Sequence, residues 1–477
     1  MQNKTSLPIF ILLLITKNLM AIDWPQWRGP DRSGTSKESG LLQSWPEDGP
    51  KLLWEGGAVG VGFSSLAIKG EYIFTMGDKD GSSHLFCLQK SDGKEIWKVQ
   101  VGKPGGNYSG TRCTPTVDED AVYALGQFGD LICVEVRTGR ERWRKNIQQD
   151  FGGQAGGWNY SESVLIDGDL LLCSPGSREA SAVAFNKKNG AVIWKTALPG
   201  AGKASYSSWV ISKGAGIKQY VRLFDGGTYG VDARSGKYLW HYDKLGRNTA
   251  NIPTPIPFDD YIFTAAGYGK GGALLKLARS GSGVTATEVY FTRELKNKHG
   301  GIVKVGNYIY GDFDDRGQPW CADVMTGKVL WKKDNGAGSG SACVTYGDGR
   351  VYFRYQDSTM ALIDADPAKG FNQISTFKIP DNMKQSWAHP VISNSKLYLR
   401  GNNKILCYDI SDPSRKQTPA ANHAPRIWKD STGNFQVEAT YQSQQGGNVM
   451  LKKTNGTVIK VPIFRLSVQD RNYLRGL

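Results

Sequence analysis

The densest carboxylates of this 477-residue sequence are Asp312, Asp314 and Asp315, within the stretch GDFDDRG. Oxygen ligands at this spacing could hold Ca²⁺, or one carboxylate could act as a general base. The stretch follows an apolar strand pattern and ends in Gly, which instead predicts a solvated hairpin turn without a metal. The sequence also lacks G-x-S-x-G, H-E-x-x-H and glycine-rich phosphate-binding motifs, and five histidines leave little material for nucleophilic or zinc chemistry.

Binding residues are better indicated in eight segments that recur along the chain, from VGVGFSS to KQSWAHP. At one aligned position these segments carry eight different residues, namely Phe63, Arg112, Ser161, Tyr206, Ile252, His299, Gly340 and Trp387. Such variety suits one asymmetric ligand, the alternative being a rim that has drifted without constraint. No catalytic residue is indicated, and the candidate ligand-binding residues at the channel rim are Phe63, Arg112, Tyr206, His299 and Trp387.

The elements that must position these segments recur with a period in the forties. A small residue, a turn with Gly and a Trp recur in phrases such as CVEVRTGRERW, which end at Trp97, Trp143, Trp194, Trp240 and Trp331. Apolar strand patterns at 288–291, 374–377 and 51–54 bring the number of outer strands to eight. Four short strands per unit predict an all-β chain with an eight-bladed β-propeller over residues 45–410.

The last copy, residues 391–409, lacks its own Trp strand, while the strand around Trp54 has no blade before it. We therefore expect the N-terminal strand to complete the last blade, which closes the ring and removes a free sheet edge. Ten residues before each Trp the chain carries a small residue, which predicts a tight packing position between blades and buried, free thiols rather than a disulfide or metal site. These residues are Cys87, Cys133, Ala184, Gly230 and Cys321, with Cys407 in the matching strand of the last copy.

The first 21 residues predict a signal peptide, with Lys4 before an apolar run from Leu7 to Ile15 and a cut after Ala21. That run is too short to cross a hydrocarbon core of ~30 Å, and no later segment is apolar enough to do so. We expect export to the periplasm or cell surface, with an uncleaved anchor as the alternative. The net charge of +15 is dispersed along the chain, which argues against nucleic acid and favours acidic partners.

The repeated phrase resembles the PQQ-like repeats of quinoprotein dehydrogenases and of the propeller lipoprotein of the outer-membrane barrel assembly machine. The opening DWPQWRGP, within residues 22–44, is similar to the N-terminal segment of exported PQQ-like proteins of planctomycete-type bacteria, and we expect it to plug or brace the propeller. The resemblance implies a quinone on an aromatic floor with a carboxylate base and Ca²⁺. The adjacent-cysteine pair of many such enzymes is absent, so the site residues do not support PQQ or Ca²⁺ as cofactors.

Residues 411–425 are polar and proline-bearing, which predicts a linker, and residues 426–477 then show alternating strands joined by Asn-Gly and Gly-Gly turns. The segment resembles the SLA homology domain of a yeast endocytic adaptor, an SH3-like barrel that recognises Asn-Pro-Phe peptides. The motifs that carry this resemblance are Arg-x-Trp-x-Asp, Gly-x-Phe-x-Val-x-Ala and Leu-Ser-x-x-Asp. The peptide-binding candidates are Trp428, Lys452, Lys453 and Lys460, the alternative being a packing module.

These features predict an exported, monomeric binding or scaffold protein that contacts a protein, peptide or small ligand through the channel mouth and the C-terminal barrel. One alternative is a PQQ- and Ca²⁺-dependent dehydrogenase of alcohols or sugars, with the quinone at the propeller axis. The other is an envelope assembly factor, although no cysteine of the lipobox type precedes Cys87. The sequence names neither the ligand nor the partner.

Overall fold

The computed structural model describes residues 23–380, 387–415, 426–445 and 448–475, so the predicted signal peptide and most of the predicted linker lie outside it. The chain divides into two compact all-β units, one spanning Asp23–Lys416 and the other containing Gln417–Leu477. Within the described ranges, no helix has the length and apolar character needed to cross a membrane.

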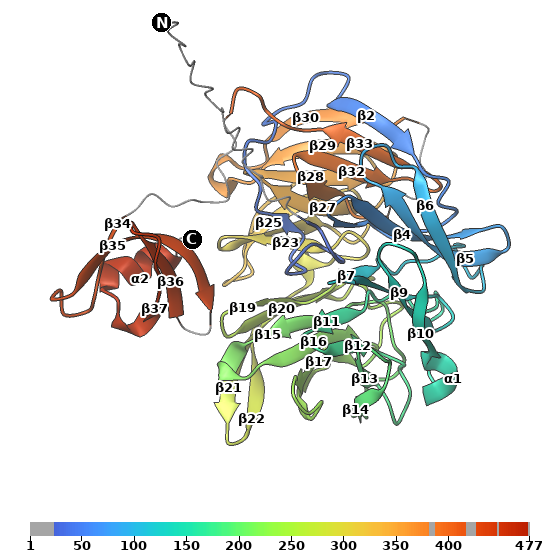
Figure 1. The fold of residues 1–477 in the computed structure, drawn as a ribbon, viewed down its shortest axis with the longest axis horizontal. Helices are drawn as coiled ribbons and strands as arrows, with labels where there is room; N and C mark the ends of the chain where they lie inside the picture. The colour runs from blue at the N-terminus through green and yellow to red at the C-terminus, as the bar shows by residue number, and fades with distance from the viewer. Residues whose placement is uncertain (1–22, 381–386, 416–425, 446–447, 476–477) are drawn as a thin grey trace, which may run out of the picture. The chain divides into compact units, whose positions relative to one another are not determined.

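Antiparallel four-stranded meanders follow one another along the larger unit, as the strand labels in Figure 1 show. The first sheet consists of β3 (Ala67–Lys69), β4 (Tyr72–Lys79), β5 (Ser82–Gln89) and β6 (Glu95–Gly102), and the second of β7 (Thr116–Asp118), β8 (Ala121–Leu125), β9 (Asp130–Glu135) and β10 (Glu141–Asn146). The third consists of β11 (Leu165–Asp167), β12 (Leu170–Cys173), β13 (Ala182–Asn186) and β14 (Val192–Thr196). The fourth consists of β15 (Val210–Ser212), β16 (Gln219–Phe224), β17 (Gly227–Asp232) and β18 (Tyr238–Tyr242).

The next sheet consists of β19 (Ile256–Phe258), β20 (Tyr261–Ala266), β21 (Gly271–Ser280) and β22 (Gly283–Thr292), and the following one of β23 (Ile302–Val305), β24 (Tyr308–Asp312), β25 (Pro319–Asp323) and β26 (Val329–Lys332). Then come β27 (Ala342–Gly347), β28 (Arg350–Tyr355), β29 (Thr359–Asp364) and β30 (Gln373–Lys378), with β1 (Thr35–Ser36) added beside β27. The last sheet consists of β31 (Val391–Ser393), β32 (Lys396–Arg400), β33 (Ile405–Asp409) and β2 (Lys51–Gly56). First strands of successive sheets lie in contact, such as β3 beside β7 and β7 beside β11. Helical segments of this unit are α1 (Ile147–Phe151), η1 (Gly214–Gly216), η2 (Arg293–Leu295) and η3 (Pro367–Lys369).

The expected closure by the N-terminal strand is confirmed, because β2 pairs antiparallel with β33 and brings Trp54 opposite Cys407. The same register recurs elsewhere and explains the small residue ten positions before each Trp. The cross-strand pairs are Cys87–Trp97, Cys133–Trp143, Ala184–Trp194, Gly230–Trp240 and Cys321–Trp331. A β-carbon on Gly230 would lie 2.3 Å from Nε1 of Trp240, so the indole leaves no room for a larger side chain. The small residue therefore faces the Trp of its own sheet, whereas the sequence predicted contact between sheets.

Contact between successive sheets is made by the Trp itself, which packs on the glycine turn of the next sheet. A β-carbon on Gly139 would lie 2.8 Å from Trp97, and one on Gly236 would lie 2.4 Å from Trp194. Where the sequence lacks a Trp, Tyr290 takes its place against Gly327 and donates its hydroxyl to the carbonyl of Val324 at 2.9 Å. The Trp of one repeated phrase and the Gly of the next phrase thus contact each other.

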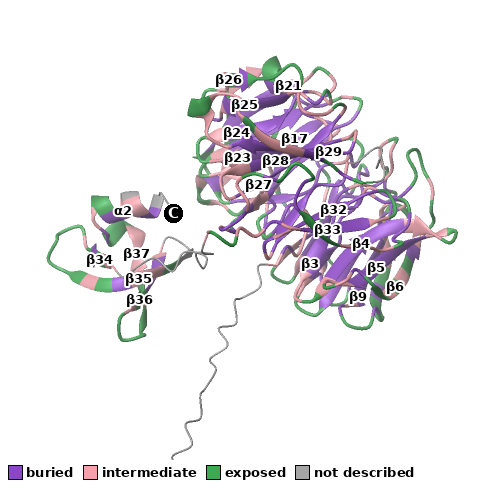
Figure 2. Cartoon of the chain, turned by 90° about the horizontal axis from the view of Figure 1, so that it is seen from above, coloured by how far each residue is buried: buried purple, intermediate pink, exposed green. Residues whose placement is uncertain are grey.

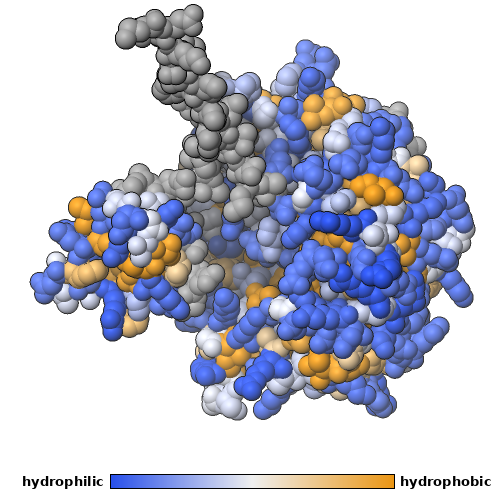
Figure 3. Space-filling view, viewed as in Figure 1, coloured by the Kyte–Doolittle hydropathy of each residue, from blue (hydrophilic) through white to orange (hydrophobic). Residues whose placement is uncertain are grey.

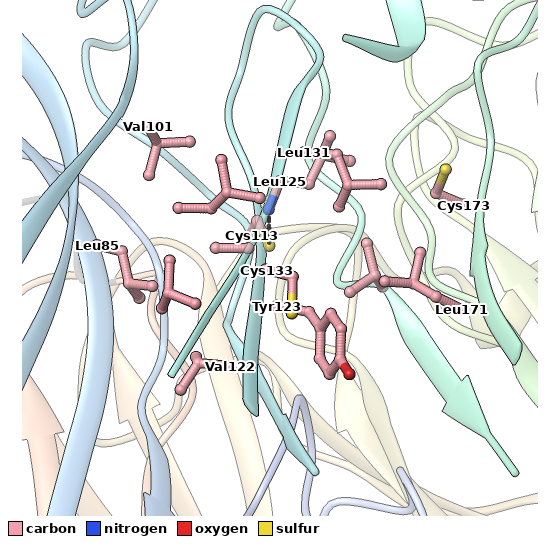
Figure 4. Close-up of a cluster of buried hydrophobic side chains, with 14 of the residues drawn as sticks. Leu85, Val101, Cys113, Val122, Tyr123, Leu125, Leu131, Cys133, Leu171 and Cys173 are labelled. Atoms are coloured by element: carbon pink, nitrogen blue, oxygen red, sulfur yellow. Dashed lines mark hydrogen bonds between the residues drawn. The ribbon is translucent and has the colours of Figure 1, made fainter. Parts of the chain in front are cut away.

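The second and third strands of each sheet carry most of the core, and the fourth strand is less buried than they are. In the first sheet, β5 is almost fully buried whereas β6 has a single buried residue (Figure 2). All seven cysteines are buried and stand outside any disulfide, and Cys113, Cys133 and Cys173 lie in one apolar cluster (Figure 4). Burial raises the pKa of Cys133 to about 11, so this thiol is protonated at neutral pH. On the face that Figure 3 shows, apolar residues lie in several separate patches among polar ones.

The N-terminal segment braces the larger unit from within, as the sequence predicted. Trp24 is buried and bridges Ile68, and β1 adds in parallel to β27. The guanidinium of Arg32 is buried and donates to the carbonyls of Ser163 and Trp209, both at 3.0 Å. The segment thus ties together sheets from both halves of the sequence.

The C-terminal unit is a single antiparallel sheet with a short helix. Its elements are β34 (Arg426–Lys429), β35 (Gln436–Gln445), β36 (Asn448–Lys453), β37 (Val458–Pro462), η4 (Ile463–Arg465) and α2 (Val468–Arg475). Trp428, Val449 and Leu451 form its core together with Leu466 and Leu474.

Candidate functional site

A cavity of about 360 Å³ opens among loops of the larger unit. Because the strands of a meander alternate in direction, the loops that enter each first strand lie at the same end as those joining the second and third strands. Both sets of loops line the cavity, and the N-terminal segment adds to them. Seven aromatic side chains dominate the lining, namely Trp27, Phe63, Tyr108, Trp158, Tyr206, Tyr268 and Trp387.

The structure brings the predicted rim residues together. Of the eight aligned positions, all but Gly340 contribute to the lining of this cavity. That set includes the five candidate ligand-binding residues, Phe63, Arg112, Tyr206, His299 and Trp387. Residues more than 300 positions apart in sequence therefore share one site.

Trp387 is the centre of an aromatic cluster on the cavity wall. The His299 ring stacks on it with centroids 4.7 Å apart and planes 10° apart. Phe63 lies 4.8 Å away at 31°, and Tyr108 meets it edge-on at 5.4 Å. The indole Nε1 of Trp387 donates to Oε1 of Gln356 at 3.1 Å, which fixes the ring plane. A flat ligand would find prepared apolar surfaces here.

His299 is fixed from several sides. Its Nδ1 lies 3.0 Å from Oδ1 of Asp315 and 3.3 Å from the hydroxyl of Ser341. Burial would raise the pKa of Asp315, but the hydrogen bonds from His299 and Ser341 and the nearby charges of His299 and Lys298 hold it below its usual range. Asp315 is thus the anionic partner of His299, and its contact with Nδ1 orients the imidazole.

The expectation of a solvated carboxylate turn after β24 is wrong. Asp312 is buried and accepts from the backbone N–H groups of Gln318 at 2.7 Å and Ala342 at 3.1 Å. Asp314 accepts from the N–H of Tyr268 at 2.6 Å in the preceding sheet. Burial raises the pKa of Asp312 to about 7. The turn sits between neighbouring loops rather than in water, which one sheet's sequence pattern could not reveal.

The N-terminal segment contributes Trp27 and Arg28 to the lining of the cavity. The Trp27 ring meets His389 edge-on, with centroids 4.5 Å apart. The Arg28 guanidinium donates to the carbonyls of Ser33, at 2.8 Å, and Ile302. Burial lowers the pKa of Arg28 to about 10 and, with help from Arg28, that of His389 to about 3, so the imidazole is neutral. The brace predicted from sequence is therefore also part of the site.

Arg112 holds the loop that carries Tyr108. Its guanidinium donates to the carbonyls of Asn107 at 2.8 Å, Tyr108 at 2.9 Å and Gly110 at 3.2 Å, and it lies 5.4 Å from the Phe63 ring centroid. Burial lowers the pKa of Arg112 to about 10, so the charge is retained at neutral pH at a desolvation cost.

The cavity residues fit a quinone better than they fit its metal. The aromatic walls could stack on a flat cofactor, but Asp315 is the one carboxylate among the lining residues and His299 already engages it. Over the described part of the chain, no three His, Cys, Asp or Glu side chains gather into a metal-binding group. The donor set therefore does not match a calcium site.

In the C-terminal unit the candidate peptide-binding residues differ in exposure and in the sheet face on which they lie. Trp428 is buried, 1% exposed, and donates its Nε1 to the carbonyl of Ala439 at 2.9 Å, so it belongs to the core. Lys452 and Lys460 are exposed, and the strand register places both on the same sheet face, beside the exposed Val458. Lys453 is the next residue along β36 after Lys452, so it lies on the opposite face of the sheet.

Several lining residues were not predicted from the sequence to line this cavity. Tyr108 and Trp158 stand in the same recurring segments, three or four positions before the aligned residue, so aromatic content alone could have found them. Tyr268, Asp315 and Gln356 come from loops between second and third strands, whose convergence requires knowledge of the closed arrangement.

The family model described as outer membrane protein assembly factor BamB matches residues 81–333, more than half of the chain. A model described as SLA1 homology domain 1 matches residues 415–477. The outer membrane protein assembly factor BamB of Burkholderia pseudomallei is 26% identical over 263 residues, covering 53% of this chain and 62% of that protein.

The quinoprotein ethanol dehydrogenase of Pseudomonas aeruginosa is 27% identical over 202 residues, covering 37% of this chain and 31% of that protein. The chain thus spans less than two thirds of the length of either curated relative. Among solved structures, the quinohemoprotein alcohol dehydrogenase of Comamonas testosteroni superposes with a TM-score of 0.59 at 11% identity, over 83% of this chain and 81% of that one. Such a likeness shows a β-propeller type of fold and no more.

Proposed function

Because this chain belongs to the PQQ-like repeat family, whose model is described as outer membrane protein assembly factor BamB, we propose that it is an exported, monomeric binding protein. Its larger unit is an eight-bladed propeller closed by β2, and its C-terminal unit is an SH3-like barrel. The cavity at the channel mouth holds a ligand, and the barrel supplies a second contact. Two weak contacts on one chain give avidity beyond either alone.

One observation carries this proposal: seven different residues from aligned positions line one cavity, together with Trp27 and Arg28 of the N-terminal segment. A fold that needs only a channel gains nothing from such variety, and a concave, mostly apolar cavity is the usual form of a ligand site. The tight packing around Trp387 prepares the walls before a ligand arrives.

A binding screen with matched variants tests the proposal. The mature chain is titrated with a set of small organic compounds, and intrinsic tryptophan fluorescence and calorimetry report binding. Trp387→Ala is expected to weaken true cavity ligands at least tenfold, while Ile193→Ala, at an exposed position on β14, leaves them unchanged. The absence of any compound whose binding depends on Trp387 would contradict the proposal.

An assembly role is the second candidate, because the family model and one curated relative carry the name outer membrane protein assembly factor. In that role the channel mouth or the C-terminal barrel would hold a protein of the envelope. Defects in outer-membrane protein content after deletion of the gene, restored by the full chain but not by Trp387→Ala, would favour it over a small-molecule role.

A PQQ-dependent dehydrogenase is the third candidate, raised by the quinoprotein relative. The mismatch of the donor set with calcium counts against it. Titration with PQQ and Ca²⁺, followed by a dye-linked assay of alcohol and sugar oxidation, decides the question, because saturable binding with turnover would establish the enzyme.

A further inference from the structure

The charges around the cavity are unbalanced toward the positive. Arg28 and Arg112 both line it, and every hydrogen bond that the described residues give these guanidinium groups ends on a carbonyl or main-chain oxygen. Asp315, the carboxylate in the lining, is already engaged by His299 at 3.0 Å and has Lys298 at 4.0 Å. Asp78 acts electrostatically on Arg112, and its Oδ2 accepts from the N–H of Gly105 at 2.7 Å and from the amide of Gln127 at 3.1 Å. Asp31 acts likewise on Arg28, and its Oδ1 accepts from the N–H of Ser33 at 3.1 Å and from the Ser33 hydroxyl at 2.6 Å.

Arg28 is buried and Arg112 is half-buried, and among the described residues neither guanidinium forms an ion pair with a carboxylate. Such cations favour an anion at close range, since charge pairs are stronger where water is excluded. A ligand cation is disfavoured for the same reason, although the aromatic walls alone would suit one. Lys298 strengthens this bias, because its Nζ lies 4.4 Å from the ring centroid of Tyr268, another lining residue.

The body of the ligand is set by the walls. The Trp387 cluster and the pair of Trp158 and Tyr206, whose ring centroids are 5.7 Å apart, present flat apolar surfaces. Aromatic side chains favour stacked or edge-on contacts with a second flat ring system. The cavity volume of about 360 Å³ has room for a small fused ring.

We infer that the cavity takes a flat organic anion, an aromatic acid whose carboxylate faces Arg28 and Arg112 and whose rings lie against the aromatic walls, without a metal. This inference rests on the proposed binding function and names its ligand class. It requires no calcium, since the two guanidinium groups supply the positive charge.

The test compares 2-naphthoate with the neutral 2-naphthylmethanol in calcium-free buffer, using calorimetry on the full mature chain. The acid is expected to bind at least tenfold more tightly than the alcohol. Its affinity falls with added NaCl, whereas that of the alcohol does not.

Gln356→Glu provides a sharp variant, because it adds a negative charge to the lining and retains the oxygen that accepts from Trp387. It is expected to weaken 2-naphthoate ~5–30-fold, the effect of a unit charge about 8 Å away at an effective dielectric constant of about 20–40. Binding of 2-naphthylmethanol stays within about threefold. Gln356→Met is the uncharged control, and an unchanged melting temperature confirms that each variant folds.

Equal affinities for acid and alcohol, or equal losses for both with Gln356→Glu, overturn the anion inference while leaving Trp387-dependent binding intact. Failure of both naphthalenes to bind, when other compounds still bind through Trp387, also overturns the inference alone. If no compound binds through Trp387, the proposed function itself fails.

Discussion

Trp54 and Cys407 are cross-strand partners, although they come from the beginning and the end of the sequence that builds the larger unit. The pair joins β2 to β33, and the Trp54 ring also lies 6.1 Å from that of Tyr398. This single sheet is assembled from both ends of the chain. Its stability therefore depends on a contact that forms only when the chain is complete.

Trp54→Ala is expected to lower the free energy of unfolding by about 1–3 kcal/mol, because the side chain is partly buried and its loss opens the closing sheet. Leu53→Ala, at the neighbouring 40% exposed residue, should change it by less than about 0.5 kcal/mol. Denaturant unfolding followed by circular dichroism measures both. Equal effects would mean that Trp54 does not secure the closure.

Gly93 is the partner of Trp54 in the first sheet, where a β-carbon would lie 2.6 Å from the indole. Gly81 has a similar positive φ, 77° against 71°, but nothing within 4 Å. Both alanine substitutions carry the backbone cost of a positive φ, about 1 kcal/mol, and only Gly93→Ala adds a clash. We expect Gly93→Ala to destabilise the protein by about 1–3 kcal/mol more than Gly81→Ala, as measured by thermal and denaturant unfolding.

The repeated phrase was predictable because its glycines and tryptophans are visible in the sequence, and the structure gives each a partner. Which glycine packs against which tryptophan was not predictable, because Gly139 contacts Trp97 of the preceding sheet and this pairing appears only when the sheets are stacked. The rim residues were found from aligned positions alone. The roles of Asp315 and Arg28 were missed, since their partners come from distant segments.

Asp312 makes stability depend on pH. Burial raises the pKa of Asp312 to about 7, whereas the unfolded chain keeps the ordinary value near 4. The folded state therefore holds a proton that the unfolded state has lost, and this stabilising contribution, fully present below about pH 4, disappears as pH rises through 7. Relative to Asp312→Asn, the native protein is expected to lose melting temperature between pH 5 and pH 8. A difference between the two proteins that stays constant over this range would contradict the assignment.

Arg32 tests the N-terminal brace. Its buried guanidinium donates to the carbonyls of Ser163 and Trp209, and its Nε donates to Oε1 of Gln26 at 2.9 Å. Arg32→Lys keeps the charge, so the desolvation cost of a buried cation is retained, but one ammonium group cannot reproduce the planar set of donors. Carbonyls left without a partner cost about 1–3 kcal/mol.

We therefore expect Arg32→Lys to lower the free energy of unfolding by about 1–3 kcal/mol. Arg137→Lys, at an exposed turn residue, should remain within about 0.5 kcal/mol of the native protein. Because Arg32 and the lining residue Arg28 lie on one short segment, loosening the brace should also loosen this part of the cavity lining. Limited proteolysis with N-terminal sequencing would then detect faster cleavage near residues 24–36 in Arg32→Lys, and unchanged cleavage would show that Arg32 stabilises the sheets without holding the segment.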